Sequence, residues 1–193
     1  MVIKDLEAYA KENHVPIMEH DGIEFLTNYI KDHEEIAHIL EIGCAIGYSA
    51  IRMALIRDNI HITTIERDRE RYLKAVENVK AFHLEERITI LFQDALEVQL
   101  DGKYDLIFID AAKSQYIKFF EKFTPLLSEN GVVFSDNLLF HGYTKQKERI
   151  ESKNLRQLVQ KIRKYITYLE DNPNYTTQFY KIGDGIAVTK RKK

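Results

Sequence analysis

Residues 37–66 carry the pattern that decides the fold, and they read AHILEIGCAIGYSAIRMALIRDNIHITTIE. A β-branched apolar run ends at Ile42, a turn with two glycines follows, and an apolar run of helical spacing begins at Tyr48. A second β-branched run ends at Glu66. Glycine at a strand-to-helix turn lets the backbone approach a ligand closely. The stretch therefore predicts a strand–helix–strand unit with a binding site at the turn.

The same alternation continues along most of the chain. Strands are expected at Ala37–Ile42, Ile60–Ile65, Ile88–Phe92, Tyr104–Ile109 and Val132–Ser135, and helices between them at Tyr48–Arg57, Arg69–Phe82 and Gln115–Leu127. Parallel neighbouring strands need crossover connections, which are usually helices that cover the sheet. The pattern predicts a doubly wound α/β fold, with a mostly parallel sheet of seven strands and helices on both faces.

The two ends of the chain depart from this alternation. Helices are expected at Leu6–Glu12 and Gly22–Lys31, within an N-terminal segment of residues 1–31. In residues 141–193, a basic amphipathic helix at Asn154–Leu169 precedes strands at Thr176–Ile182 and Gly185–Thr189. The turn Gly183–Asp184 between these strands favours an antiparallel hairpin at the sheet edge. No repeat or linker divides residues 1–193, so we expect a single domain.

Composition excludes several classes of protein. Hydrophobic residues make up 45% and charged residues 30% of the chain, and no stretch approaches the roughly 20 apolar residues that span a bilayer. The first 14 residues are rich in charge and lack the apolar core of a secretory signal, which predicts a cytoplasmic protein. Cys44 is the only cysteine, so an internal disulfide is impossible.

Charge is distributed unevenly along the chain. Residues 141–193 hold 13 Lys and Arg against five Asp and Glu, whereas residues 1–140 hold 15 against 25. A basic C-terminal quarter on an acidic body suggests a polyanionic partner, and a solvated helix face with a charged tail is the alternative.

A nucleotide site is predicted at the ends of the first three strands. The spacing from Gly43 to Gly47 differs from the Gly-x-Gly-x-x-Gly that binds a pyrophosphate, which disfavours NAD and FAD. Glu66, 23 positions after Gly43, ends the second strand, where an acid can bind both ribose hydroxyls. Asp94 and Ala95 follow the third strand and could face an adenine. Glu66 could instead be a solvated strand end, and Asp94 a helix cap.

The next two strands end in the acidic motifs that indicate chemistry. Asp110 follows the fourth strand, and Asp136 and Asn137 follow the fifth. Oxygen ligands without neighbouring Cys or His favour a hard cation such as Mg²⁺, which lowers the pKa of a bound hydroxyl. Lys113 would lie over the same pocket as a general base. The alternatives are helix caps for the two aspartates and an exposed surface position for the lysine.

Four motifs together resemble the cation-dependent O-methyltransferase family, which includes catechol and caffeoyl-coenzyme A O-methyltransferases. They are Glu41–Ser49, Ile109–Lys113, Ser135–Asn137 and Gly183–Gly185, and the resemblance runs from about Val15 to Thr189. It implies a Rossmann-like class I methyltransferase fold, S-adenosylmethionine as cofactor and, usually, a homodimer. It also implies Asp110, Asp136 and Asn137 as metal ligands, with Lys113 and Asp110 as catalytic residues. The cofactor site would comprise Met18, Gly43, Ala45, Ser49, Glu66, Asp94, Ala95 and Asp110.

Within the family, further segments are most similar to the bacterial members that methylate 5-hydroxyuridine at the tRNA wobble position. These segments are Leu6–Ala10, His14–Glu19, Ala45–Ala54 and Asp136–Phe140. The sequence departs from the family pattern by lacking part of a common N-terminal helical extension.

The substrate that this resemblance implies, the anticodon region of tRNA, has a physical rationale. In 5-hydroxyuridine the 5-oxygen neighbours the 4-carbonyl oxygen, so the two can chelate one cation as catechol oxygens do. Phosphates could be neutralised by Lys145, Lys147, Arg149, Lys153, Arg156, Lys161, Arg163, Lys164 and the tail Lys190–Lys193. Two alternatives remain, namely a small catechol-like phenol as substrate and a non-catalytic nucleotide-binding module.

Overall fold

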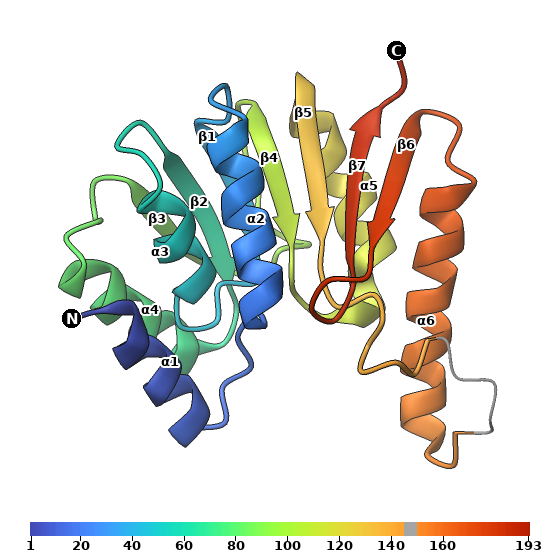
Figure 1. Ribbon diagram of the computed structural model, residues 1–193, viewed down its shortest axis with the longest axis horizontal. Helices are drawn as coiled ribbons and strands as arrows, with labels where there is room; N and C mark the ends of the chain where they lie inside the picture. Colours follow the sequence, from blue (N-terminus) through green and yellow to red (C-terminus); the bar gives the residue numbers. More distant parts are fainter. Residues whose placement is uncertain (145–149) are drawn as a thin grey trace.

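The computed structural model describes residues 1–144 and 150–193. Its strands form one sheet of seven in the order β3-β2-β1-β4-β5-β7-β6, and all pairs are parallel except those that involve β7. The strands are β1 (His38–Ile42), β2 (His61–Glu66), β3 (Ile88–Phe92), β4 (Tyr104–Ile109), β5 (Leu127–Ser135), β6 (Tyr175–Tyr180) and β7 (Ile186–Arg191). The predicted fold class is confirmed, and the C-terminal antiparallel pair forms the sheet edge (Figure 1).

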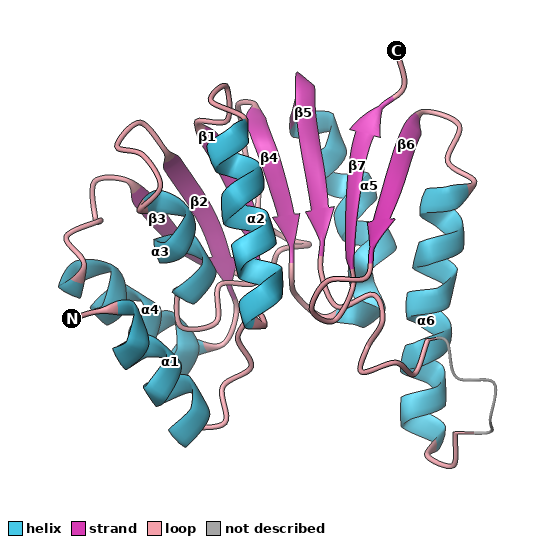
Figure 2. Cartoon of the chain, viewed as in Figure 1, coloured by secondary structure: helices cyan, strands magenta, loops and turns pink. Residues whose placement is uncertain are grey.

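Helices cover both faces of this sheet (Figure 2). They are α1 (Ile3–Glu12), α2 (His20–Asp32), α3 (Tyr48–Ala54), α4 (Arg69–Ala81), α5 (Tyr116–Phe123) and α6 (Lys153–Glu170), with 3₁₀ turns η1 (Lys113–Gln115) and η2 (Thr124–Leu126) beside α5. None of the described helices is long and apolar enough to cross a membrane.

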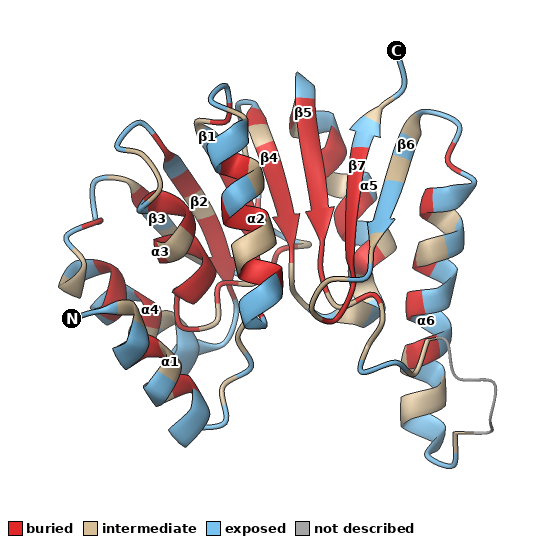
Figure 3. Ribbon diagram, viewed as in Figure 1, coloured by how far each residue is buried: buried red, intermediate tan, exposed pale blue. Residues whose placement is uncertain are grey.

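Alternate residues of the central strands supply two separate cores. In β4, Leu106 and Phe108 face the cluster formed with α1 to α4, whereas Ile107 and Ile109 face the cluster formed with α5 and α6. This follows from the two-residue period of a strand, and it explains why the strand sequences are continuously apolar. The central strands are buried along most of their length, whereas the edge strand β6 is largely exposed (Figure 3).

Several predicted boundaries were wrong. The helix expected over Gln115–Leu127 is α-helical only to Phe123, because Pro125 cannot donate the next helical hydrogen bond and a 3₁₀ turn replaces it. The strand expected from Val132 begins at Leu127, which pairs with β4. The helix expected over Tyr48–Arg57 ends at Ala54.

The hairpin turn is also longer than predicted. Residues 181–185 connect β6 to β7, in place of the two-residue turn Gly183–Asp184. The backbone carbonyls of Asp184 and Gly185 accept hydrogen bonds from Leu139 and Leu138, at 2.7 and 3.0 Å, so this backbone pairs with the loop after β5 and leaves the strand ladder.

The parallel strands place their carboxyl ends at one edge of the sheet, the lower edge in Figure 1. The connections that follow β1 to β5 leave from this edge and carry most of the predicted site residues, whereas Met18 lies between α1 and α2. The tail at Lys190–Lys193 lies at the opposite edge, because β7 runs antiparallel to β5.

Candidate active site

A cavity of about 330 Å³ opens at the carboxyl edge, within the usual size range of small-molecule sites. Its walls include every residue predicted for the cofactor site, namely Met18, Gly43, Ala45, Ser49, Glu66, Asp94, Ala95 and Asp110. Lys113 and Asn137 line the same cavity, whereas Asp136 does not.

The glycine turn after β1 forms one wall of the cavity and approaches β4 closely. Gly43 has φ +99°, and a Cβ atom at this position would overlap the carbonyl oxygen of Asp110. The amides of Gly43 and Asp110 donate to the carbonyls of Ile65 and Ile42, at 3.1 and 3.0 Å, which fixes the turn between the neighbouring strands. Ala45 also has a positive φ of 46°, a strained conformation of the kind found at binding sites.

Glu66 holds this turn against β2. Its carboxylate accepts hydrogen bonds from the amides of Ala45, Arg67 and Asp68, at 2.8 to 2.9 Å, and the residue is only 8% exposed. The alternative of a solvated strand end is therefore wrong. A carboxylate can accept about four hydrogen bonds, so the Glu66 carboxylate can still accept one from a hydroxyl group in the cavity.

Asp94 caps a turn after β3, where no helix follows, so the alternative of a helix cap is wrong. Its Oδ1 accepts from the amide of Leu96 at 2.8 Å, which is the local cap, and its Oδ2 lies 3.3 Å from Nη1 of Arg67. The residue also lines the cavity.

Glu41 is a fully buried carboxyl group beneath the turn. It accepts hydrogen bonds from the hydroxyls of Ser49 and, at 2.5 Å, Thr64. Burial raises its pKa from the ordinary value of 4.5 to about 7, although the two hydroxyls oppose the change. Ser49, a predicted cofactor residue, is thus held from below by a group that titrates near neutrality.

We expect Glu41 to make stability fall as pH rises. Because its folded pKa lies above its ordinary value, its contribution is fully present below about pH 4.5 and lost as pH rises through 7. The effect between pH 5 and 8 is about 3 kcal/mol in the free energy of unfolding. Urea titrations of the wild type and Glu41→Gln at several pH values measure it. The variant should become relatively more stable as pH rises, and parallel curves would contradict this assignment.

The two predicted aspartates and Asn137 meet at the cavity wall. Nδ2 of Asn137 lies 3.1 Å from Oδ1 of Asp110 and 3.1 Å from Oδ2 of Asp136. Burial raises the pKa of both carboxyl groups, and the charge of Asp110 raises that of Asp136 further. Asp136 is 3% exposed and lies behind the other two. Within residues 1–144 and 150–193, no three His, Cys, Asp or Glu side chains form a metal-binding group, so any cation here depends on the amide as well.

Lys113 begins the 3₁₀ turn after β4, and its half-buried side chain points toward the same region. Its Nζ lies 5.7 Å from the ring centroid of Phe140, and its charge lowers the pKa of Asp110 against the larger effect of burial. The alternative of an exposed surface lysine is not what the structure shows. An ammonium, the Asp110 carboxyl group and an amide therefore line the same cavity, and the amide also contacts the Asp136 carboxyl group.

Comparison with known proteins assigns this arrangement to a family. The model of the O-methyltransferase family matches residues 1–192. The chain belongs to the O-methyltransferase family.

Relatives of this O-methyltransferase include tapetum-specific methyltransferase 1 of Arabidopsis thaliana, which is 30% identical over 159 residues, or 79% of this chain and 68% of the relative. The structure of a Staphylococcus aureus protein provisionally named a caffeoyl-CoA O-methyltransferase is 41% identical, with a TM-score of 0.94 over 100% of this chain and 93% of that one. The Podospora anserina methyltransferase PaMTH1, solved with S-adenosylhomocysteine, is 26% identical, with a TM-score of 0.78 over 89% and 78% of the two chains.

The cavity of this O-methyltransferase is also lined by residues that sequence reasoning missed. The segment between α1 and α2 contributes Pro16 and Ile17 to the cavity, and α3 contributes Tyr48. Further lining residues are Cys44, Arg67, Arg71, Gln93, Gln115 and Phe119. Four of these residues had a sequence signal, because Cys44 and Tyr48 lie in the first motif and Pro16 and Ile17 lie in the segment His14–Glu19.

The Gly-Asp-Gly motif of the O-methyltransferase has a structural role that the sequence did not reveal. Oδ1 of buried Asp184 accepts from the amide of His141, and a Cβ at Gly185 would lie 2.6 Å from Cγ of Leu139. Phe140 and His141 both have positive φ, at 45° and 53°. The motif therefore holds a strained loop that begins at the proposed metal ligands.

Proposed function

We propose that this O-methyltransferase transfers a methyl group from S-adenosylmethionine to the 5-hydroxyl of 5-hydroxyuridine at the tRNA wobble position, with a divalent cation such as Mg²⁺. The observation that carries the proposal is that Asn137 contacts both Asp110 and Asp136, and that Asp110 and Asn137 line the same cavity as the predicted donor residues. The resemblance of the sequence motifs supports the choice of donor and acceptor.

The donor residues fit S-adenosylmethionine, which supplies an electrophilic methyl group when bound. The glycine turn admits a ligand because Gly43 leaves no side chain over Asp110. Glu66 has acceptor capacity for a ribose hydroxyl, and Asp94 with Ala95 would flank the adenine. Relatives support this donor, since PaMTH1 was solved with S-adenosylhomocysteine.

The residues at the other end fit a hard cation, which supplies positive charge that lowers the pKa of a neighbouring hydroxyl. Two buried carboxyl groups share a single amide group, and the charge of Asp110 raises the pKa of Asp136 although Lys113 opposes this change. Rotation of the Asn137 amide would present its Oδ1 beside the carboxylates, and three oxygens suit Mg²⁺. In its neutral amine form, Lys113, at the same cavity, would accept the proton from the acceptor hydroxyl and become the ammonium.

A basic helix beside the site supports an RNA acceptor. Lys153, Lys161 and Lys164 are exposed on α6, which packs against η1. Arg156 and Arg163 donate to backbone carbonyls of the preceding loop, at Ile150 and Thr144 among others. The predicted phosphate contacts Lys145, Lys147 and Arg149 lie outside the described residues. The tail at 190–193 lies at the opposite edge of the sheet, so the predicted phosphate contacts of the tail are not with the tRNA segment that α6 would bind.

A small phenol is the second candidate substrate. It is favoured by the names of the relatives, which include caffeoyl-CoA O-methyltransferase from Stellaria longipes at 32% identity over 112 residues. A vicinal diol would present the same pair of oxygens to a cation, but it gives no role to the basic face of α6.

Nucleoside mass spectrometry distinguishes these substrates. Purified protein with S-adenosylmethionine and Mg²⁺ should convert 5-hydroxyuridine in tRNA to 5-methoxyuridine, and tRNA binding should weaken steeply with salt. Lys164→Glu should weaken tRNA binding, whereas Lys193→Glu, at the opposite edge, should not. Unmodified tRNA together with rapid turnover of catechol would favour the phenol. Absence of any transfer would favour a nucleotide-binding module.

Gly43→Ala should impair donor binding. A methyl group at this position would overlap Asp110, so we expect the Kd for S-adenosylhomocysteine to rise at least about tenfold. Strain from the positive φ costs a further 1–3 kcal/mol of stability, roughly. Gly102→Ala is a matched control, because Gly102 has φ +101° but no atom within 4 Å of the added carbon. Calorimetry and thermal unfolding should show lost stability in both variants and lost binding only in Gly43→Ala. Equal binding by the two would refute the steric argument.

A further inference from the structure

The segment between α1 and α2 forms a roof over the donor cavity. Pro16, Ile17 and Met18 line the cavity from this segment, and Met18 is 5% exposed. On either side, α1 and α2 are packed into the apolar core through residues such as Leu6 and Ile23. The position of the roof therefore depends on how these two helices are held against the rest of the protein.

A chain of polar contacts ties the two helices to α3. Tyr48 donates its hydroxyl hydrogen to Oε1 of Glu7 on α1 at 2.8 Å, and accepts a hydrogen bond from Nη1 of Arg52 at 3.1 Å. Arg52 also forms an ion pair with Glu24 on α2. The guanidinium of Arg52 lies 5.8 Å from the centroid of the Tyr48 ring. Together these contacts join α1, α2 and α3 around the roof, and the Tyr48 hydroxyl itself bonds to α1.

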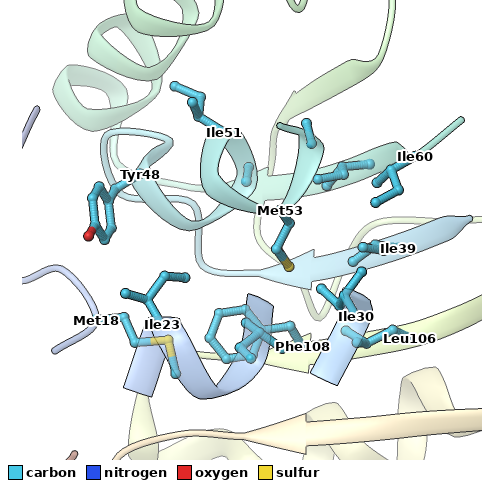
Figure 4. Packing of buried hydrophobic residues seen from close by; sticks show 14 of the residues in the cluster. Met18, Ile23, Ile30, Ile39, Tyr48, Ile51, Met53, Ile60, Leu106 and Phe108 are labelled. Carbon is cyan, nitrogen blue, oxygen red and sulfur yellow. The ribbon is translucent and has the colours of Figure 1, made fainter. Parts of the chain in front are cut away.

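Tyr48 is also in contact with the cavity. The residue is 3% exposed and lines the cavity, and Figure 4 places it at the same end of the apolar cluster as Met18. Its pKa is raised to about 12, by burial first and then by the bond to Glu7, so the hydroxyl remains a donor at physiological pH. The residue therefore borders the cavity while its hydroxyl is bonded to α1.

We propose that Tyr48 is a positioning residue for the methyl donor, which couples the wall of the donor cavity to α1 and so holds the Pro16–Met18 roof over the bound ligand. The bond to the Glu7 carboxylate is charge-assisted and partly buried, which makes it stronger than a neutral hydrogen bond. Loss of this bond frees α1 and the roof while leaving the floor of the cavity, at Gly43 and Glu66, in place. Donor affinity should fall, and the chemistry of the bound complex should not.

S-adenosylhomocysteine titration by calorimetry tests this coupling. Tyr48→Phe and Glu7→Ala should each raise the Kd about tenfold, which corresponds to 1.4 kcal/mol. The double variant should be no weaker than either single one, because both remove the same bond. Glu7→Gln retains an acceptor and should bind nearly as well as the wild type. Tyr9→Phe, on α1 but outside this chain of contacts, is the matched control.

Two further measurements separate positioning from general stability. In the wild type, S-adenosylhomocysteine should slow amide hydrogen exchange in residues 7–19, and this protection should be lost in Tyr48→Phe. The KM for S-adenosylmethionine should rise about tenfold with kcat unchanged. An unaltered Kd, additive effects in the double variant or retained protection would each overturn the proposal. The inference rests on the donor site of the proposed function, and failure of the wild type itself to bind would count against that function instead.

Discussion

Asp136→Asn is expected to lower kcat by roughly 10³-fold and, in the presence of EDTA, to raise the thermal stability of the protein. A thousandfold loss corresponds to about 4 kcal/mol of transition-state stabilisation, the scale expected for removing a charged ligand of a catalytic cation. The gain in stability follows from burial and from the charge of Asp110, which raise the pKa of Asp136 because both destabilise its ionised form. The neutral amide avoids this cost.

Initial rates across a Mg²⁺ titration and thermal unfolding in EDTA measure the two effects. Binding of S-adenosylhomocysteine should persist, because Asp136 does not line the cavity. Asp101→Asn, in an exposed loop, is the matched control and should change neither quantity. Full activity of Asp136→Asn, or activity of the wild type that EDTA does not reduce, would exclude a cation at this position.

The local sequence pattern was sufficient to predict the strands of the sheet and the polar residues that follow their carboxyl ends. Each of the five predicted strands of the body overlaps an observed strand, because a buried parallel strand needs a continuous β-branched run. Asp110 and Asn137 were expected to meet, since parallel strands end at one edge, and their side chains are hydrogen-bonded across 27 positions of sequence. A predicted helix boundary was wrong where a single residue ended the helix within an apolar stretch, as Pro125 does after α5.

Contacts between distant segments could not be predicted in this way. Glu7 and Tyr48 are 41 positions apart, and nothing in either local pattern indicates the other. The same is true of Asp184 and His141, whose bond forms only because β7 inserts between β5 and β6. The sequence predicted a two-residue hairpin turn at Gly183–Asp184. The backbone carbonyls of Asp184 and Gly185 instead accept hydrogen bonds from the loop after β5. Sequence periodicity thus specifies the sheet and the helices that cover it. The hydrogen bonds between distant segments around the site depend on tertiary packing.

Lys113→Met should reduce kcat at neutral pH by about 10²- to 10⁴-fold, the usual contribution of a positioned general base. The variant keeps an unbranched side chain of similar length, so the contact with Phe140 and the binding of S-adenosylhomocysteine should survive. Activity should recover partly as pH rises, because the acceptor hydroxyl then ionises without a base. Lys118→Met, exposed on α5, is the matched control for the loss of one positive charge.

Stopped-time assays of methyl transfer from pH 6 to 10, with saturating donor, measure this dependence. A variant that loses activity equally at every pH would indicate that Lys113 acts through its charge on Asp110, whose pKa it lowers, and not through proton transfer. Retained activity at neutral pH would remove Lys113 from the mechanism altogether. The base would then have to come from another group at this end of the cavity, or from solvent.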